Sequence, residues 1–506
     1  MRKFLPRLLA AALLAAAVPA VAQTAEDVAR LDAVKALAER ASGLAAQGQL
    51  EPALALIDEG LAVRPEPGRE RGGLLYMQAL LLSDLRRPAE AVTAIDAAAA
   101  MLPDRPELRL MQAQVQLRAG QAEAASRTVV YMADAFPAGL TKIDEPWLSQ
   151  LLRELEGPAK EELRFDLLMA LSSRGYAGRG TPGAADWMYD DAILGLLKRD
   201  RLDEAKAMAA KFVDSSALVR MLVDRRYAKL WPAIEAKAGP RAAKAIAAEV
   251  AAVEAAYRAK PQDYETVAAY LAALRGVGRV GEAVTVSTPF AADMAKVEAG
   301  GEDAFWVINE HAYALAAAGR VDEADAAFAK LLAMDLAKNP ALITMAINRG
   351  SLLTSYGRPA AALAVAEWVT AKGDRATTGF GLMWVAATRA CALKALDDPG
   401  ATAALGMLTA DPKINYPAAT MALLCADRLD EAEKLVLARL EDPARRGGML
   451  LAFQDFEQDA PGGATFRAAL AAKLLAIRDR PAVRKAIARH GRILPIAARQ
   501  TTWGGF

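Results

Sequence analysis

Histidine and cysteine are scarce in this sequence of 506 residues, which contains two of each. Metal sites and nucleophilic catalysis need imidazole, thiolate or clustered carboxylate groups at defined spacings. His311 and His490 belong to no His-Glu-x-x-His motif, and neither Gly-x-Ser-x-Gly nor Ser-x-x-Lys occurs in the chain. The sequence therefore predicts no catalytic residue, no metal ligand and no cofactor, and hence a protein that is not an enzyme.

Aromatic residues are also few, at 6% of the chain, and the runs of β-branched residues that buried parallel strands require are missing. Alanine and leucine dominate instead. The chain is longer than the roughly 250–300 residues at which single hydrophobic cores stop growing. The composition therefore favours helices throughout, in several domains or in a repeat array.

The amino terminus has the pattern of an export signal. A basic start over residues 2–7 precedes an apolar stretch over 8–18, and Ala20 and Ala22 supply the small residues that signal peptidase accepts. We expect residues 1–22 to be a signal peptide cleaved after Ala22, which makes the mature chain periplasmic or secreted. An uncleaved anchor is the alternative, but the stretch is shorter than the ~20 apolar residues that span a bilayer.

The mature chain has no strong excess of charge. Residues 1–22 contain three basic and no acidic side chains, so cleavage changes the balance from 62 against 61 to 59 (62 minus 3) against 61. A net charge of −2 without a basic cluster gives no electrostatic surface for nucleic acid. No later segment is long and apolar enough to cross a membrane, so we expect no integral membrane span in the mature chain.

Three segments near the amino terminus repeat the same spacing. Ala53 is followed after four residues by Ile57 and after twelve by Pro65, and the same offsets recur from Ala91 and from Ala125. The steps between the alanines are 38 and 34 residues. This spacing is typical of a helical hairpin, in which a small residue lets two backbones cross closely and proline ends the second helix. Glycine or a short polar residue before the crossing forms the turn.

These features resemble the tetratricopeptide repeat family. The best unit runs over residues 309–328, with Ala312 in its first helix, a turn glycine at Gly319 and the pair Glu323-Ala324 at the crossing. Four more crossings have the same pattern: Ala205, Ala283, Ala362 and Ala432. The resemblance implies an all-α fold, an α-solenoid of tetratricopeptide-like helix-turn-helix repeats that form a superhelix, in an exported bacterial protein.

The copies are poor between about Thr141 and Pro261, and this divides the chain. We expect a signal peptide (1–22), N-terminal repeats (23–140), degenerate helical repeats or an insert (141–260), further repeats (261–445), and a C-terminal helical cap and tail (446–506).

A superhelix of this kind has a concave wall lined by the first helix of each pair, and this groove suits an extended peptide or a partner's helix. The repeat register places on that wall Tyr76, Gln114, Trp306, Asn309, Tyr313, Asn348, Ser351 and Thr354. Aromatic rings mixed with amide and hydroxyl groups suit recognition of backbone amides or sugar hydroxyls. The simpler interpretation is a solvated polar wall.

The two cysteines, Cys391 and Cys425, belong to neighbouring helical pairs. An oxidising compartment would allow them to form a disulfide. Their positions within the repeats do not correspond, however, and this favours two separate buried thiols.

Two functions fit this sequence. The first is a periplasmic scaffold that mediates protein–protein interactions in a cell-envelope assembly, with a protein or peptide partner. The alternative is a soluble periplasmic protein that binds a small molecule, glycan or peptide between two lobes.

Overall fold

The structure, a computed structural model, describes residues 25–63, 65–178, 180–373, 377–457 and 465–499. The chain divides into two compact units, Met1–Arg179 and Gly180–Phe506, and the division falls inside the stretch where the repeats are degenerate. The predicted signal peptide with its cleavage after Ala22, and the last residues of the predicted tail, lie outside the described residues.

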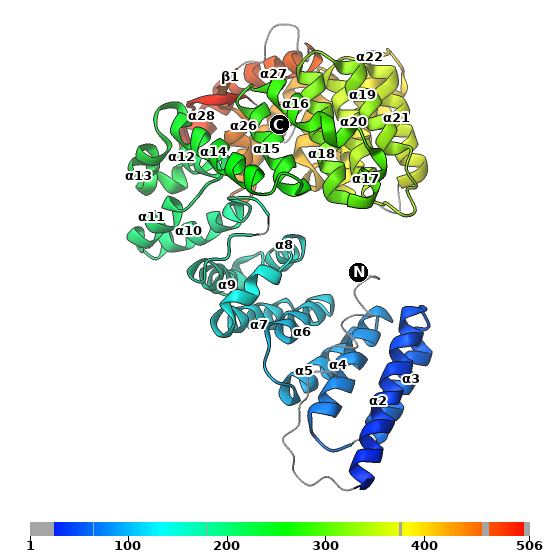
Figure 1. Ribbon diagram of the computed structural model, residues 1–506. Coiled ribbons are helices and arrows are strands. Elements are labelled where there is room, and N and C mark those ends of the chain that lie inside the picture. The colour runs from blue at the N-terminus through cyan, green and yellow to red at the C-terminus, as the bar shows by residue number, and fades with distance from the viewer. Residues whose placement is uncertain (1–24, 64, 179, 374–376, 458–464, 500–506) are drawn as a thin grey trace. The chain divides into compact units, whose positions relative to one another are not determined.

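The first unit consists of antiparallel helical pairs (Figure 1). The pairs are α2 (Ala25–Ala46) with α3 (Leu50–Val63), α4 (Arg69–Asp84) with α5 (Pro88–Met101), and α6 (Pro106–Arg118) with α7 (Ala122–Ala135). They are followed by η1 (Pro137–Lys142), α8 (Glu145–Glu154), η2 (Pro158–Lys160) and α9 (Glu161–Ser173).

The second unit begins irregularly and then returns to regular pairs. Its first elements are η3 (Asp186–Met188), α10 (Tyr189–Lys198), α11 (Leu202–Ala210), α12 (Ser215–Val223), η4 (Arg225–Leu230), α13 (Trp231–Ala238), η5 (Pro240–Ala242) and α14 (Ala243–Ala259). The regular pairs are α15 (Tyr264–Gly276) with α16 (Val280–Ala291), α18 (Glu302–Ala317) with α19 (Val321–Leu332), α20 (Leu342–Ser355) with α21 (Pro359–Gly373), α22 (Gly379–Ala395) with α23 (Gly400–Ala410), and α24 (Tyr416–Cys425) with α25 (Leu429–Glu441). Two short elements separate some of these pairs: α17 (Met294–Gly300) precedes α18, and η6 (Pro412–Ile414) precedes α24.

The last elements that the structure describes are α26 (Arg446–Ala452), β1 (Asp455–Glu457), α27 (Thr465–Arg478), α28 (Pro481–His490) and β2 (Pro495–Arg499). The two short strands pair in parallel. Apart from this small sheet, the described chain is a succession of helices. The structure therefore confirms the predicted all-α solenoid of tetratricopeptide-like pairs.

The predicted crossing alanines lie at the points where the helices approach most closely. All of them have no exposed surface: Ala53, Ala91, Ala125, Ala205, Ala283, Ala324, Ala362 and Ala432. Larger side chains one turn away fill the space beside the crossings, for example Ile57, Ile95 and Phe328, which are also fully buried. A methyl group is thus the largest side chain that the crossing distance admits.

The turn inside each pair reverses the chain through one residue with positive φ. Glycine reaches this conformation at no cost, as at Gly319 with φ 81°. The residue at this position of the turn has a positive φ in every pair: Gly48, Arg86, Gly120, Asp200, Gly278, Gly319, Gly357, Asp397 and Asp427. The next residue is often an arginine that pairs with a glutamate in the first turn of the second helix.

At Arg320, Nε and Nη2 donate to the two carboxylate oxygens of Glu323 at 2.7 and 2.6 Å. The same contact joins Arg87 to Glu90, Arg201 to Glu204, Arg279 to Glu282 and Arg428 to Glu431. These pairs are largely exposed and so stabilise the fold little individually. They account for the recurrent Glu-Ala dipeptides as structural charges at a helix start.

Consecutive pairs are also joined by a side-chain bond that recurs at one register position. The first helix of a pair reaches back to the second helix of the preceding pair. The contacts are Gln78 Nε2 to Asp58 Oδ1 (2.7 Å), Gln112 Nε2 to Asp96 Oδ1 (2.8 Å), His311 Nδ1 to Ser287 Oγ (2.7 Å) and Arg349 Nε to Asp325 Oδ1 (2.6 Å). At these four interfaces, polar residues at this position therefore join one pair to the next.

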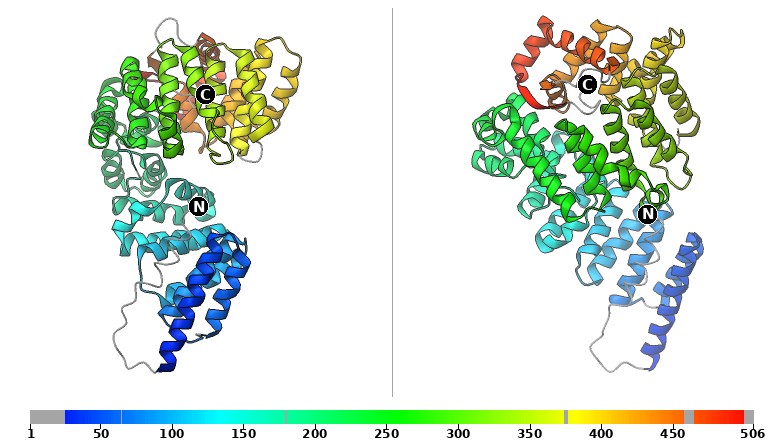
Figure 2. Two further views of the ribbon diagram at one scale, coloured as in Figure 1. Left: turned by 45° about the vertical axis from the view of Figure 1, so that its right-hand side comes forward. Right: turned by 45° about the horizontal axis from the view of Figure 1, so that its top comes forward.

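The second unit closes on itself, because its last elements pack against its first. Helix α26 contacts α12, and β2 contacts α14; Figure 2 shows the carboxy-terminal elements in red beside the green helices. Arg492 Nε donates to the carbonyl oxygen of Leu222 at 2.7 Å, and Gly491 pairs with Asp224 in an antiparallel bridge. A Cβ atom at Gly491 would lie 2.2 Å from the carbonyl oxygen of Val223, so this closure requires glycine.

We predict that Ala91→Leu destabilises the first unit by about 1–3 kcal/mol, because the added atoms cannot fit at the crossing. Ala100 lies on the same helix but is exposed, so Ala100→Leu should change stability by less than about 0.5 kcal/mol. Urea denaturation of both variants checks this. Equal effects of the two substitutions would contradict the packing assignment.

Candidate binding surface

The first helices of successive pairs contact one another directly and form the inner wall of each unit. In the first unit α2 contacts α4 and α4 contacts α6; in the second, α18, α20, α22 and α24 contact in sequence. The second helices of the pairs lie on the opposite, outer face. All eight residues predicted for the concave wall belong to first helices, namely α4, α6, α18 and α20.

In the first unit the predicted residues are Tyr76 on α4 and Gln114 on α6. Tyr76 is 6% exposed, and burial together with the nearby Glu107 carboxylate raises the pKa of its hydroxyl to about 12. Gln114 is half-buried. Arg118 also joins these two helices, with Nη1 donating to Ser83 Oγ at 2.9 Å. The wall here combines an aromatic ring with amide, guanidinium and carboxylate groups.

In the second unit, Asn309, Tyr313 and Asn348 come together, and two residues that the sequence analysis missed join them. Asn348 Nδ2 donates to Asn309 Oδ1 at 2.9 Å, and Asn309 Nδ2 donates to Glu310 Oε1 at 3.2 Å. Arg275 Nε and Nη2 donate to Glu310 Oε2 at 2.9 and 2.6 Å. We call these five residues the wall network. It spans α15, α18 and α20.

Tyr313 closes the wall network into a cycle. Its hydroxyl donates to the carbonyl oxygen of Asn348 at 3.2 Å, and the Arg275 guanidinium lies over its ring, at 5.2 Å from the centroid. Burial raises the pKa of Tyr313 well above its usual value, so the hydroxyl stays protonated and remains a donor. The amides of Asn309 and Asn348 are therefore engaged with each other and with their neighbours.

The other predicted residues of α18 and α20 differ in accessibility. Ser351 and Thr354 are 6% and 4% exposed, and their hydroxyls donate to the carbonyl oxygens of Ile347 and Gly350 one turn earlier. Trp306 is 37% exposed and remains at the surface. Of this group, Trp306 is thus the residue that a partner can reach directly. The buried hydroxyls satisfy themselves within their own helix because no water reaches them.

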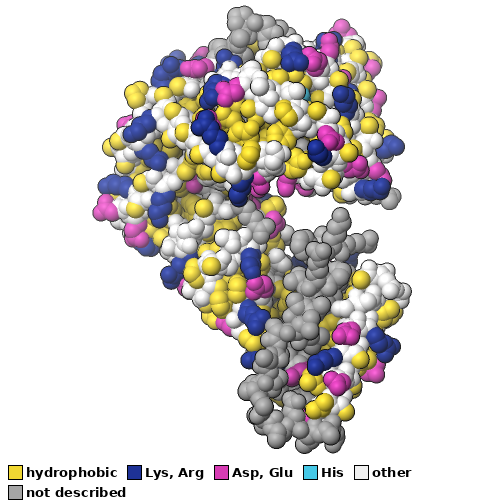
Figure 3. Space-filling model, viewed as in Figure 1, with side chains coloured by type: hydrophobic (Ala, Val, Ile, Leu, Met, Phe, Trp, Pro, Cys, Tyr) yellow, Lys and Arg dark blue, Asp and Glu magenta, His cyan; other side chains and the backbone are white. Residues whose placement is uncertain are grey.

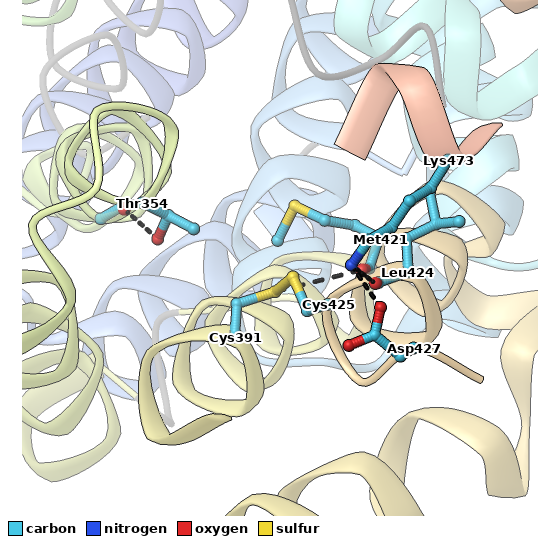
Figure 4. The surroundings of a disulfide bond; sticks show 8 residues. Thr354, Cys391, Met421, Leu424, Cys425, Asp427 and Lys473 are labelled. Carbon is cyan, nitrogen blue, oxygen red and sulfur yellow. Dashed lines mark hydrogen bonds and ion pairs between the residues drawn. A yellow bond between two sulfur atoms is a disulfide. The ribbon is translucent and has the colours of Figure 1, made fainter. Parts of the chain in front are cut away.

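Part of the inner wall of the second unit is covered by the chain itself. Helix α27 packs against the first helices α20 and α24, and buries Leu470, Leu474 and Ile477. Lys473 Nζ donates to the carbonyl oxygen of Leu424 at 3.0 Å and pairs with Asp427 at 2.6 Å (Figure 4). The spacing of the three apolar residues is that of an amphipathic helix face. The sequence spacing alone predicts an amphipathic helix here, but it does not predict that this helix packs on the inner wall.

The two cysteines form a disulfide, in place of the separate thiols that their offset repeat positions favoured (Figure 4). Cys391 lies one turn before the end of α22, and Cys425 is the last residue of α24. The Cα atoms are 5.2 Å apart. The end of α24 therefore lies beside α22 at a point one turn before the end of α22.

His311 faces Ser287 across the interface between two pairs. Both are buried, and Ser287 Oγ also contacts the carbonyl oxygen of Ala283 at 2.7 Å. Burial is the main cause that lowers the pKa of His311 to about 4, with Arg320 and Lys330 adding to the effect and Glu323 opposing it. A pocket of about 290 Å³ adjoins the ring. Ser287 has no exposed surface, so this pair does not present a nucleophile to that pocket.

The described residues show neither a surface patch of one charge on the face in Figure 3 nor a cluster of metal ligands. On the face shown in Figure 3, basic and acidic side chains are interspersed. Within the described ranges, no group of three or more His, Cys, Asp or Glu side chains could hold a metal ion. A search of the same residues finds no helix with the length and apolarity needed to cross a bilayer.

Comparison with known proteins gives weak similarities only. No family model and no curated protein match the chain. Similar solved structures include the Naa15/Naa10 complex bound to HypK-THB (15% identity, 96% of this chain and 79% of that chain, TM-score 0.27) and the P58(IPK) TPR domain (14%, 88% and 99%, 0.19). A third is the human IFIT1 dimer with m7Gppp-AAAA (13%, 96% and 95%, 0.31). TM-scores this low carry no argument about function, so the fold assignment rests on the helical pairs themselves.

We predict that acid destabilises the second unit through His311. The pKa in the folded state, about 4, lies below the unfolded value of about 6.5, so the unfolded chain binds the extra proton first as the pH falls. The neutral ring therefore makes its full contribution to the free energy of unfolding above about pH 6.5. This contribution is lost as the pH falls towards 4, and the loss amounts to about 2–3 kcal/mol.

The variant His311→Gln tests this, since glutamine occupies the same position at Gln78 and Gln112. Thermal unfolding between pH 7 and 4.5 should show a smaller loss of stability in His311→Gln than in the wild type, and no such change in the control His490→Gln. A parallel pH dependence in all three proteins would refute the assignment.

Proposed function

We propose that this chain is an exported, periplasmic or secreted scaffold that binds a protein partner in a cell-envelope assembly and catalyses no reaction. The helical pairs with their continuous inner walls support a binding role, because such walls suit extended peptides and partner helices. The basic and apolar start of the sequence supports export.

The disulfide is the single observation that carries the assignment to an oxidising compartment. The sequence contains two cysteines, and the structure pairs both of them. Structural disulfides persist in secreted and periplasmic proteins and are reduced in the cytosol. The bond closes a separation of 34 residues, which in the chain-entropy picture stabilises the fold by roughly 3–4 kcal/mol.

The inner wall of the first unit is the better candidate for the partner surface. In the second unit, the wall network occupies the polar side chains of α18 and α20, and α27 covers α20 and α24. In the first unit, Gln114 is half-buried beside Arg118 and Ser83. We therefore place partner binding on α4 and α6 of the first unit.

We predict that the chain synthesised with residues 1–22 forms the Cys391–Cys425 disulfide in the cell, whereas a chain without these residues keeps both thiols reduced. Alkylation of free thiols in rapidly quenched cells, read by mass spectrometry, distinguishes the two states. The variant Cys391→Ser marks the signal of one free thiol. Reduced thiols in the chain that includes residues 1–22 would rule out the oxidising compartment.

We also predict that a photo-crosslinking amino acid at Gln114 captures a defined envelope protein in intact cells. The matched control places the same amino acid at Ala100, which is exposed on α5 of the same unit. Capture from position 114 and not from 100 supports binding at the inner wall. The same products from both positions, or none from either, would count against it.

A further inference from the structure

Helix α23 differs from the other helices in its lack of charge. Among the α-helices that the structure describes, α23 and α24 contain no Asp, Glu, Lys or Arg. Helix α24 is almost entirely buried, so it has no need of charged side chains. Helix α23, by contrast, exposes Thr402, Ala403, Gly406, Met407 and Ala410, of which only Thr402 has a polar side chain. Surface helices of soluble proteins normally have a polar outer face, so this face is an exception that needs an explanation.

Exposed apolar side chains gather around the same helix. Of the nine large hydrophobic residues exposed in the described parts of the chain, five lie between positions 380 and 414. They are Phe380, Leu382, Leu396, Met407 and Ile414, and Met407 is the most exposed of all nine at 67%. Phe380 and Ile414 are held together, since Asn415 Nδ2 donates to the carbonyl oxygen of Phe380 at 3.0 Å. Phe380 and Leu382 belong to the first helix α22, so Met407 is the large apolar side chain that α23 itself exposes. Exposed apolar surface of this kind marks an interaction site.

The outer face also contains a recess close to this helix. A pocket of about 420 Å³ lies where α19, α20 and α21 meet, and α21 precedes α23 among the second helices. Its walls are mainly apolar, from Leu332, Ala361, Ala364, Val365 and Trp368. The one charged side chain in the wall, Arg349, is already paired with Asp325 at 2.6 Å. The pocket therefore suits an uncharged, flexible side chain.

We propose that the outer face of the second unit is a dimer interface between two copies of this chain, in which Met407 of each copy enters the pocket between α19 and α21 of the other. The occupant is a second copy because the chain presents both parts of the contact, a protruding apolar side chain and an uncharged recess, on neighbouring second helices. A partner surface with charges would lose their hydration against α23 without gaining counter-charges.

This arrangement makes the interface isologous. When the same patch serves both copies, each Met407 contacts the other copy's pocket, and the two contacts close the dimer. The small residues beside Met407, Ala403 and Gly406, allow the two outer faces to approach closely. The flexible thioether of methionine adapts to an irregular recess.

The first test compares single substitutions in the purified full chain by analytical ultracentrifugation over a range of concentrations. The wild type should form a dimer, and Met407→Lys or Ala364→Glu should raise the dimer dissociation constant at least about tenfold, because each places a charge in an apolar contact. Met407→Leu should retain the dimer. The control Val28→Lys introduces the same charge at a residue of the first unit that is 43% exposed, and should change nothing.

The second test distinguishes this contact from simple packing of α23 on α23. In a mixture of Met407→Lys and Ala364→Glu chains, the mixed dimer has one native contact and one Lys–Glu contact, so association should return. Circular dichroism of each variant establishes that it is folded. A monomeric wild type, a dimer insensitive to Met407→Lys, or a mixture without recovery would each overturn the proposal.

Discussion

The close crossing of two helices at an alanine is the constraint on which the rest of this structure depends. Every regular pair except α22 with α23 has one of the predicted alanines fully buried at that point, and the backbones can approach because a methyl group fills the space between them. The crossing fixes the position of the turn, and the turn fixes where the next first helix begins. The side-chain bonds from Gln78, Gln112, His311 and Arg349 join four of the pairs to the preceding pair. The close approach of two helices at each alanine thus determines how the helical pairs are arranged in the superhelix.

The inner walls of the two units use their polar residues differently. In the second unit, Asn309 and Asn348 bond to each other, and Arg275 and Glu310 complete a cycle with Tyr313. Buried polar groups must be satisfied, and here they satisfy one another, so the same side chains both hold three helices together and lose their availability to a ligand. Helix α27 adds a cover from within the chain. The first unit has no such cover among its described helices, which is why its wall is the stronger candidate for a partner.

The outer face of the second unit changes character along the array. Helix α19 has acidic and basic residues on its exposed side, whereas α23 has none. In a repeat protein each pair depends mainly on its neighbours for stability, so the outer face of a pair is free to change without loss of the fold. The disulfide between α22 and α24 reinforces the region next to this apolar face. Stability and interaction are therefore assigned to different surfaces of the same helical pair.

The sequence alone determined the features that depend on local chemistry: the helical class, the crossing alanines, the left-handed turns and the repeat of pairs. These follow from side-chain size and backbone conformation within about 34 residues, the length of one repeat. Only the tertiary structure decided that Cys391 meets Cys425, that Ser351 and Thr354 are buried, that α27 covers α20 and α24, and that Gly491 closes the second unit against Val223. Each of these depends on the relative lengths and angles of helices far apart in sequence. Such angles are the sum of many small packing contacts, which no local pattern of residues specifies.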